Sequence, residues 1–155
     1  MSVILETDTF NPANIYYVQN VKNNVKQNSY FSRIIYSTDH FSLKNIYFSF
    51  NLMNPTFKEQ YLKTIIYFNE KDCQLDKLYK IEREFLEKYI EYKTFNRTDE
   101  KLIPNYSIFN QCKSNSIKVF KNNATNNNNK TIEILIKISG IWQTDNNIGI
   151  TYKFI

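Results

Sequence analysis

The sequence has 155 residues, an apolar fraction of 42% and a formal net charge of +5, which is enough for one domain with one core and gives no support to a second domain. No stretch approaches the roughly 18 to 20 consecutive apolar residues that span a bilayer, and the first ten residues lack the basic start and long apolar run of a secretory signal. We therefore expect an intracellular protein without a membrane partner.

Residues 1–28 are polar and rich in asparagine, and they contain few apolar anchors. We interpret them as a partly ordered N-terminal arm with one short strand or helical turn. The folded domain is then expected over residues 29–155.

Three strands are predicted between residues 30 and 68, where aromatic and β-branched residues are frequent. Residues 30–37 form the first. In the second, residues 43–52, strict alternation assigns one set of side chains to the core and the other to solvent or ligand. The core set is Ile46, Phe48, Phe50 and Leu52, and the open set is Asn45, Tyr47, Ser49 and Asn51. In the third, residues 61–68, we expect Leu62, Ile66 and Phe68 to face the core and Tyr61, Lys63, Ile65 and Tyr67 to lie on the other side.

A change of period at about residue 72 predicts an amphipathic helix over residues 73–93. Asp72 is placed to cap its first turn. The apolar stripe recurs at three- and four-residue steps and consists of Leu75, Leu78, Ile81, Phe85, Leu86, Tyr89 and Ile90.

The C-terminal part reads as a charged loop at 94–105 followed by strands. Short strands are predicted at 106–110 and 116–121, and the asparagine tract 122–130 is too polar to pack and reads as a hairpin tip. In residues 131–139, four isoleucines alternate strictly with Glu133, Leu135, Lys137 and Ser139, which predicts one buried and one open face. Gly140 allows a bulge, residues 145–147 form a turn, and residues 148–155 form the last strand.

Strands on both sides of one helix, without β–α–β alternation, predict a mainly β fold of the β-rich α+β kind, with antiparallel pairing and one inserted helix.

No motif for catalysis or metal binding is present, and two glycines are too few for a phosphate-cradling loop. Cys73 and Cys112 belong to no zinc-type cluster and read as reduced thiols, and His40 reads as a loop residue. Glu82 and Glu84 are interpreted as part of a solvated helix face. We expect no enzyme, no cofactor and no metal, because loop acids alone are weak support for Mg²⁺; those acids are Asp99, Glu100 and Asp145.

Aromatic residues interleaved with lysines on strands are the remaining signal. Binders of single-stranded nucleic acid stack bases on flat rings and follow phosphates with cations. The candidate binding residues on predicted open faces or strand ends are Arg33, Tyr47, Lys63, Tyr67, Lys118, Phe120, Lys137, Trp142 and Lys153. Any one of these residues taken alone is better explained structurally, as a tyrosine that forms strands well with its hydroxyl in water, so the hypothesis rests on their joint placement opposite the aliphatic face.

Two alternatives stay open. Trp142, the single tryptophan, either plugs the end of a barrel or stacks on a base. The positive charge favours a polyanionic partner, but residues with A/T-rich codons make up more than half of the chain, so an AT-rich genome also explains part of the lysine surplus.

The C-terminal stretch ILIKISGIWQTDNNIGITYKFI resembles the closing hairpin of the single-stranded DNA-binding proteins of bacteriophages and large DNA viruses. The order of strands, helix and strands over residues 30–155 is also similar to that family. The resemblance implies an OB-fold-like antiparallel barrel with one inserted amphipathic helix at about 73–93. For a viral source it implies the host cytoplasm or nucleus.

The expected function is therefore binding of single-stranded DNA without sequence preference, which protects or organises the DNA during replication, recombination or repair. RNA as the ligand, replication proteins as partners and self-association stay open. The alternative is a non-enzymatic interaction protein or virion component that uses the same exposed aromatic residues to contact protein.

Overall fold

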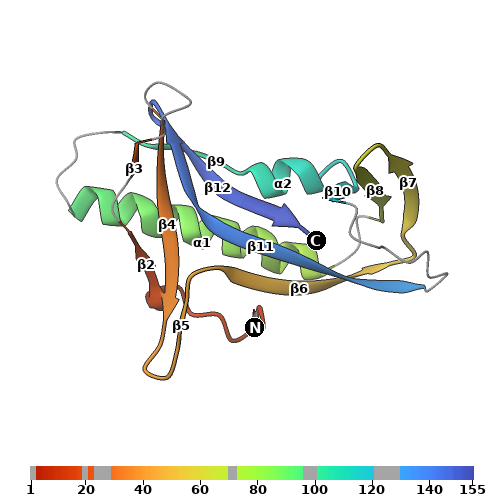
Figure 1. Cartoon of the computed structure of the whole chain (residues 1–155), viewed down its shortest axis with the longest axis horizontal. Coiled ribbons are helices and arrows are strands. Elements are labelled where there is room, and N and C mark those ends of the chain that lie inside the picture. Colours follow the sequence, from red (N-terminus) through yellow and green to blue (C-terminus); the bar gives the residue numbers. More distant parts are fainter. Residues whose placement is uncertain (1–2, 19–20, 23–28, 70–72, 96–100, 121–129) are drawn as a thin grey trace.

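The computed structural model describes residues 3–18, 21–22, 29–69, 73–95, 101–120 and 130–155. Over these residues the fold is mainly β: a twelve-stranded sheet curls into a half-barrel, and one long helix lies against it (Figure 1). The prediction of a β-rich fold with one main helix is confirmed.

The described strands of the sheet are numbered along the chain. The first seven are β1 (Ile4–Leu5), β2 (Ile15–Tyr17), β3 (Val21–Lys22), β4 (Ser29–Ser37), β5 (Ser42–Leu43), β6 (Ile46–Met53) and β7 (Thr56–Gln60). The others are β8 (Lys63–Tyr67), β9 (Ile103–Asn105), β10 (Ser116–Phe120), β11 (Thr131–Thr144) and β12 (Asn147–Phe154). The helical elements are the 3-10 turn η1 (Pro12–Asn14), α1 (Cys73–Phe95) and α2 (Ser107–Cys112).

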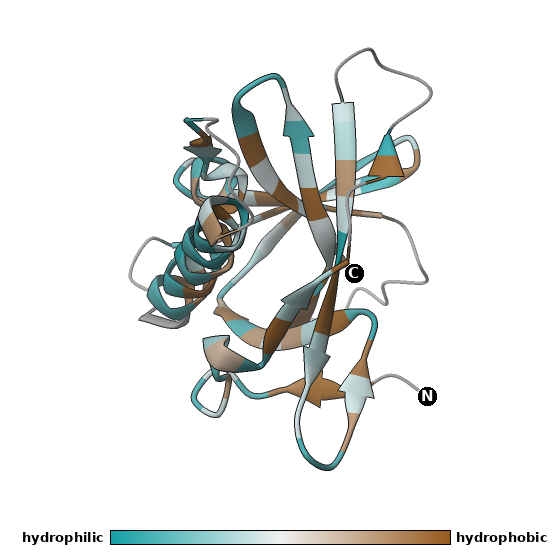
Figure 2. Ribbon diagram, turned by 90° about the vertical axis from the view of Figure 1, so that its left-hand side faces the viewer, coloured by the Kyte–Doolittle hydropathy of each residue, from teal (hydrophilic) through white to brown (hydrophobic). Residues whose placement is uncertain are grey.

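The apolar stripe of α1 packs against one face of the curled sheet and forms the core with it. In Figure 2 the helix lies along one side of the sheet, and hydrophobic and hydrophilic bands alternate along the strands. Six of the seven predicted stripe residues are buried, and Ile90 is half-buried. The strand residues in the same cluster include Ile46, Phe48, Ile136 and Ile138, each with no exposed surface. This face of the sheet is called the inner face below, and the opposite face is called the outer face.

Strand β11 holds the sheet together by pairing with two different strands on one of its sides. Residues 131–138 pair with β6, and residues 140–144 pair with β4. The register against β12 shifts between Ile138 and Gly140, so the bulge expected at Gly140 is present. A bulge bends the strand and increases its twist, which allows one strand to serve both neighbours.

The sheet is mixed, whereas the sequence predicted antiparallel pairing. Most pairs are antiparallel, but β1 runs parallel to β6, and both β9 and β10 run parallel to β12. The main path runs β1-β6-β11-β12-β10-β8-β7, with β1 and β7 at its two ends.

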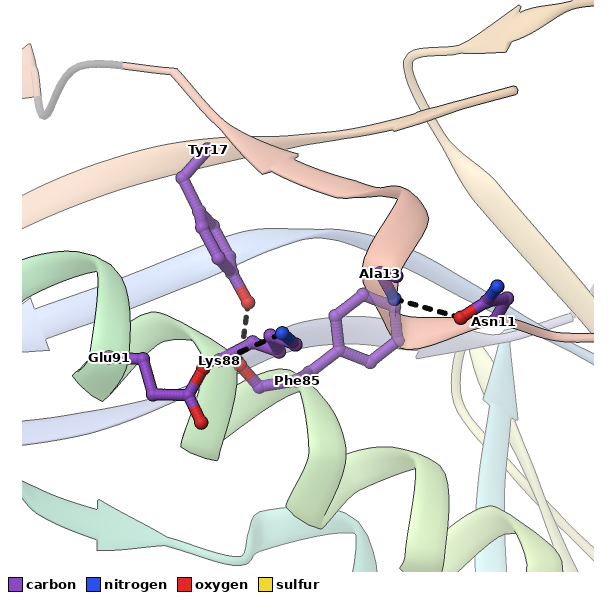
Figure 3. A network of polar contacts seen from close by, with 6 residues as sticks. All are labelled: Asn11, Ala13, Tyr17, Phe85, Lys88 and Glu91. Atoms are coloured by element: carbon purple, nitrogen blue, oxygen red, sulfur yellow. Dashed lines mark hydrogen bonds and ion pairs between the residues drawn. The ribbon is translucent and has the colours of Figure 1, made fainter. Parts of the chain in front are cut away.

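The described part of the N-terminal segment pairs with the sheet instead of standing apart from it. Strand β2 pairs with β4, and Ile15 is buried in the core. The hydroxyl of Tyr17 donates a hydrogen bond of 2.6 Å to the carbonyl oxygen of Phe85 in α1 (Figure 3). Burial raises the pKa of the Tyr17 hydroxyl far above its ordinary value, so it stays a donor. This bond ties β2 to the middle of the helix.

The strand predicted at residues 106–110 is wrong, because residues 107–112 form α2. The carboxylate oxygens of Glu82 accept hydrogen bonds from the backbone N–H groups of Ile108 and Phe109, with N···O distances of 2.8 and 2.9 Å. These are first-turn donors that have no partner within the helix. Ile108 and Cys112, four residues apart, are then buried together. A contact from α1 therefore overrides the local strand preference.

The hairpin of β7 and β8 also differs from the prediction. Residues 56–60 form a strand that the sequence did not indicate, and all five of its side chains are exposed. Leu62, expected in the core, lies in the connecting turn with a positive φ of 65° and is 63% exposed. In the pairing of β7 with β8, Ile65 lies opposite Lys58 on the outer face. Ile65 is 9% exposed and lies outside the core cluster.

Three predictions concern residues outside the described ranges: the cap at Asp72, the loop acids Asp99 and Glu100, and most of the hairpin tip at 122–130. Among the described helices, none is long and apolar enough to span a membrane.

Both glycines of the chain lie beneath aromatic rings on the outer face. A Cβ atom at Gly149 would meet the indole of Trp142, and one at Gly140 would meet the Phe31 ring and the main-chain oxygen of Ser32. Neither glycine has a positive φ. The close approach of other atoms, and not backbone conformation, therefore requires glycine at these positions.

Replacement of either glycine by alanine is expected to destabilise the fold. Overpacking costs about 1–3 kcal/mol, and Gly140→Ala should cost more than Gly149→Ala because a main-chain oxygen cannot rotate away as an indole can. Urea unfolding of the two variants measures this order. Equal or higher stability of Gly140→Ala would contradict the described packing.

Glu82 is expected to make stability depend on pH. Burial raises its pKa above the ordinary value of 4.5, although the two N–H groups oppose the change. The folded state then holds more protons than the unfolded chain above that pH, so the contribution of Glu82 is full below the ordinary pKa and is lost as pH rises through the folded-state pKa. The free energy of unfolding of the wild type, relative to Glu82→Gln, should fall as pH rises above 4.5. Urea titrations at a series of pH values provide the measurement, and a constant difference would contradict it.

Candidate functional site

All nine candidate binding residues from the sequence analysis lie on the outer face of the sheet. Their positions alternate with residues of the core cluster along each strand, so their side chains point away from α1. Six are exposed, namely Arg33, Lys63, Tyr67, Lys118, Phe120 and Lys153, and three are half-buried, namely Tyr47, Lys137 and Trp142.

Strand register brings Tyr47, Lys137 and Lys153 into one line across three strands. Lys137 of β11 lies opposite Tyr47 of β6 on one side. On its other side Lys137 lies opposite Lys153 of β12. Residues directly opposite in an antiparallel pair have Cβ atoms about 4.5–5.5 Å apart, so the three side chains are neighbours.

The line continues on β10 and β8. Val119 pairs with Phe154 in the parallel β10–β12 pair, so the residues before them, Lys118 and Lys153, are also adjacent. Phe120 lies opposite Lys63 of β8. We call this set the lysine–aromatic patch, and it consists of Tyr47, Lys63, Lys118, Phe120, Lys137 and Lys153.

The Phe120 ring is in contact with two of these lysines. The ammonium nitrogen of Lys153 lies 4.3 Å from the ring centroid, and that of Lys63 lies 5.2 Å from it. Both distances are within the range of about 6 Å over which a cation is attracted to an aromatic face. The two ammonium groups therefore gather at one ring.

The patch is electrostatically unfavourable by itself. Lys137 and Lys153 are like charges in directly opposite positions, an arrangement that destabilises a strand pair. Within the described ranges, no carboxylate lies within 4.0 Å of the ammonium group of any patch lysine, since the ion pairs found there are Lys77–Asp8, Lys80–Glu84 and Lys88–Glu91. A bound anion would relieve this repulsion.

The other three predicted residues lie on the same face but outside this line. Tyr67 faces Ser116 at the other end of the β8–β10 pair and is 40% exposed. Arg33 lies opposite Gly140, beyond the bulge. The indole of Trp142 lies against Gly149 on the outer face and belongs to no part of the core cluster, so it does not fill the interior.

Two residues near the patch were missed by the sequence analysis. Lys58 of β7 is exposed and lies opposite Ile65, on the same face as Lys118. Phe31 pairs with Trp142 and covers Gly140. Residues 56–60 contain a single apolar residue, Phe57, so they carry no apolar alternation that would have indicated a strand.

The groups considered for chemistry are dispersed. Cys112 is buried in the core, where burial raises the pKa of its thiol to about 12, whereas His40 is exposed in the turn after β4. The prediction that Glu82 lies on a solvated face is wrong, since Glu82 has no exposed surface; Glu84 is half-buried and pairs with Lys80 at 4.0 Å. In the described portion of the chain, no three acidic, histidine or cysteine side chains are grouped as metal ligands.

Two cavities lie away from the patch. One of about 500 Å³ is polar and contains the ion pair of Asp8 and Lys77 at 2.8 Å, together with Glu6 and Glu133. The other, of about 420 Å³, lies between β2 and the C-terminal part of α1 and is lined by aromatic rings, including Tyr16 and Phe95, which are 56% and 87% exposed. The acidic residues disfavour a phosphate ligand in the first cavity.

No protein-family model matches the sequence, and neither the curated proteins nor the solved structures gave a significant match. The case for a function therefore rests on the residues and their geometry.

Removal of one opposed lysine is expected to stabilise the free protein. Lys137→Gln should raise the free energy of unfolding by about 0.2–1 kcal/mol, because it ends the like-charge pairing with Lys153. The gain should shrink at high salt, which screens exposed charges. Urea unfolding at low and high salt measures this.

Lys113→Gln is the matched control for that experiment, because Lys113 is exposed at the end of α2 and its replacement changes the net charge equally. An equal gain from both variants would mean that net charge, and not the opposed pair, is responsible.

Proposed function

We propose that this protein binds single-stranded DNA without sequence preference on the outer face of its sheet. The observation that carries the proposal is the direct opposition of Lys137 and Lys153, with Lys118 and Lys63 beside them and no carboxylate in ion-pair range among the described residues. Lysines arranged in this way attract a polyanion, and each phosphate that they neutralise releases counterions.

Aromatic rings next to the cations favour a single strand over a duplex. Tyr47 lies at one end of the lysine line, and Tyr67 lies on β8, the strand at its other end. Unpaired bases can stack on such rings, at about 1–3 kcal/mol per base, whereas bases within a duplex are already stacked. Stacking accepts every base, so little sequence preference is expected.

We infer an OB-fold-like architecture as the finer description of the fold. It is supported by the curled sheet, the position of α1 between β8 and β10 in the chain, and the bulge at Gly140. OB-folds commonly present one strand face to single-stranded nucleic acid. The hairpin of β11 and β12 is the segment that resembles the phage and large-DNA-virus proteins.

The proposed role is to protect or organise single-stranded DNA during replication, recombination or repair, inside the cell in which the protein is made. In a viral setting this is the host cytoplasm or nucleus. Replication proteins and a second copy of the chain are proposed as further partners.

A second candidate function is protein interaction, as an adaptor or virion component. The specific observation that favours it is the aromatic groove between β2 and α1, where Tyr16 and Phe95 are well exposed. Exposed aromatic residues are common anchors of protein interfaces.

The test is a titration of fluorescent oligo-dT at several salt concentrations. Three phosphate contacts, made by Lys118, by Lys137 and by Lys63 together with Lys153, predict a slope of about −2 in log K against log salt, so that binding weakens about 20-fold from about 50 to about 200 mM salt. Lys118→Gln and Lys137→Gln should each reduce the slope by about 0.7, whereas Lys113→Gln should leave it unchanged.

Duplex DNA and an RNA oligonucleotide of equal length serve as competitors, and both should compete less well than oligo-dT. Absence of oligo-dT binding at low salt would refute the proposal and leave protein interaction as the better candidate.

A further inference from the structure

The two aromatic residues of the lysine–aromatic patch differ in what surrounds their rings. Phe120 is 44% exposed, and both Lys63 and Lys153 place their ammonium groups over its ring. Tyr47 is half-buried opposite Lys137, and among the described cations none lies over its ring. The rings of Phe120 and Tyr47 are therefore not equivalent.

A ring that carries ammonium groups on its face is a poor platform for a base. A stacked base needs the same face that Lys153 covers at 4.3 Å. The ring has another effect: it restricts where each lysine points. A free lysine loses up to about 2 kcal/mol of side-chain entropy when it is fixed, so a lysine already held at a ring loses less on binding.

The ligand that fits two restrained ammonium groups is a phosphate oxygen anion. The ammonium groups of Lys63 and Lys153 lie at the same ring, so their like charges repel each other, and Lys118 lies beside Lys153. No carboxylate in the described ranges is close enough to neutralise them. A phosphodiester group accepts charge-assisted hydrogen bonds from several ammonium groups at once.

We propose that Phe120 is a positioning residue whose ring holds Lys63 and Lys153 as a clamp for one phosphodiester group, while Tyr47 is the stacking face of the same surface. This inference rests on the proposed function. It separates the patch into a phosphate end on β8, β10 and β12 and a base end on β6. Different residues of this surface then bind the phosphates and the bases of a single strand.

The experiment compares Phe120→Leu with Tyr47→Leu on two ligands of equal length: oligo-dT and an oligomer of abasic deoxyribose phosphates. Phe120→Leu should weaken both ligands equally, about two- to fivefold, because a cation–π contact at an exposed site is lost. It should also reduce the salt slope by up to about 0.7, the value for one phosphate.

Tyr47→Leu should weaken oligo-dT about five- to 150-fold, the range expected when one stacked base is lost. Its salt slope and its affinity for the abasic oligomer should equal those of the wild type. Phe120→Tyr keeps the ring and should keep the wild-type slope, which a purely structural role of bulk at this position does not require.

A loss confined to oligo-dT in Phe120→Leu, with an unchanged salt slope, would overturn the inference and make Phe120 a stacking residue. If Phe120→Leu is poorly folded, Lys63→Gln alone is the check: it should lower the affinity for both ligands equally, because its ammonium group binds phosphate, and a loss confined to oligo-dT would overturn the inference. If Phe120→Leu is folded, Lys63→Gln should lower the affinity for both ligands less in the Phe120→Leu background than alone, because the two residues act together. Wild-type protein that binds neither ligand would instead refute the proposed function itself.

Discussion

The packing of α1 into the curled sheet is the constraint on which the other features depend. Its apolar stripe is buried against the inner face, so the strands place their isoleucine and phenylalanine side chains on that side. Alternation then sends every second residue of the central strands to the outer face. The lysines and aromatic rings of the patch are therefore gathered on one surface as a consequence of how the core is built.

The bend in β11 determines which outer-face residues of the neighbouring strands lie beside each other. Before Gly140 the strand pairs with β6, and after it the strand pairs with β4, while residues 136–144 pair with β12 on the other side. Lys137 lies three residues before the bulge, between Tyr47 and Lys153. The opposition of these two lysines disfavours the strand pair, and this locally unfavourable arrangement is the feature on which the proposed anion binding rests.

Local patterns in the sequence were sufficient for the central strands and the long helix. The alternation in β6 and β11 and the stripe of α1 fixed which side chains are buried, and hence which face could bind. They could not reveal α2, whose first turn is held by Glu82 from 26 residues away, or the opposition of Lys137 and Lys153, which depends on strand register. The gathering of Lys63 and Lys153 at Phe120 likewise arises only when three strands meet.

The packing of the Trp142 indole against Gly149 has a practical consequence for spectroscopy. The chain has a single tryptophan, and its half-buried indole lies on the outer face and not among the core residues. Its emission spectrum therefore responds to the solvent and ligands at that surface, while the far-ultraviolet circular dichroism of the strands and α1 follows the integrity of the fold. One unlabelled sample thus gives two different optical signals, one for the outer face of the sheet and one for the integrity of the fold.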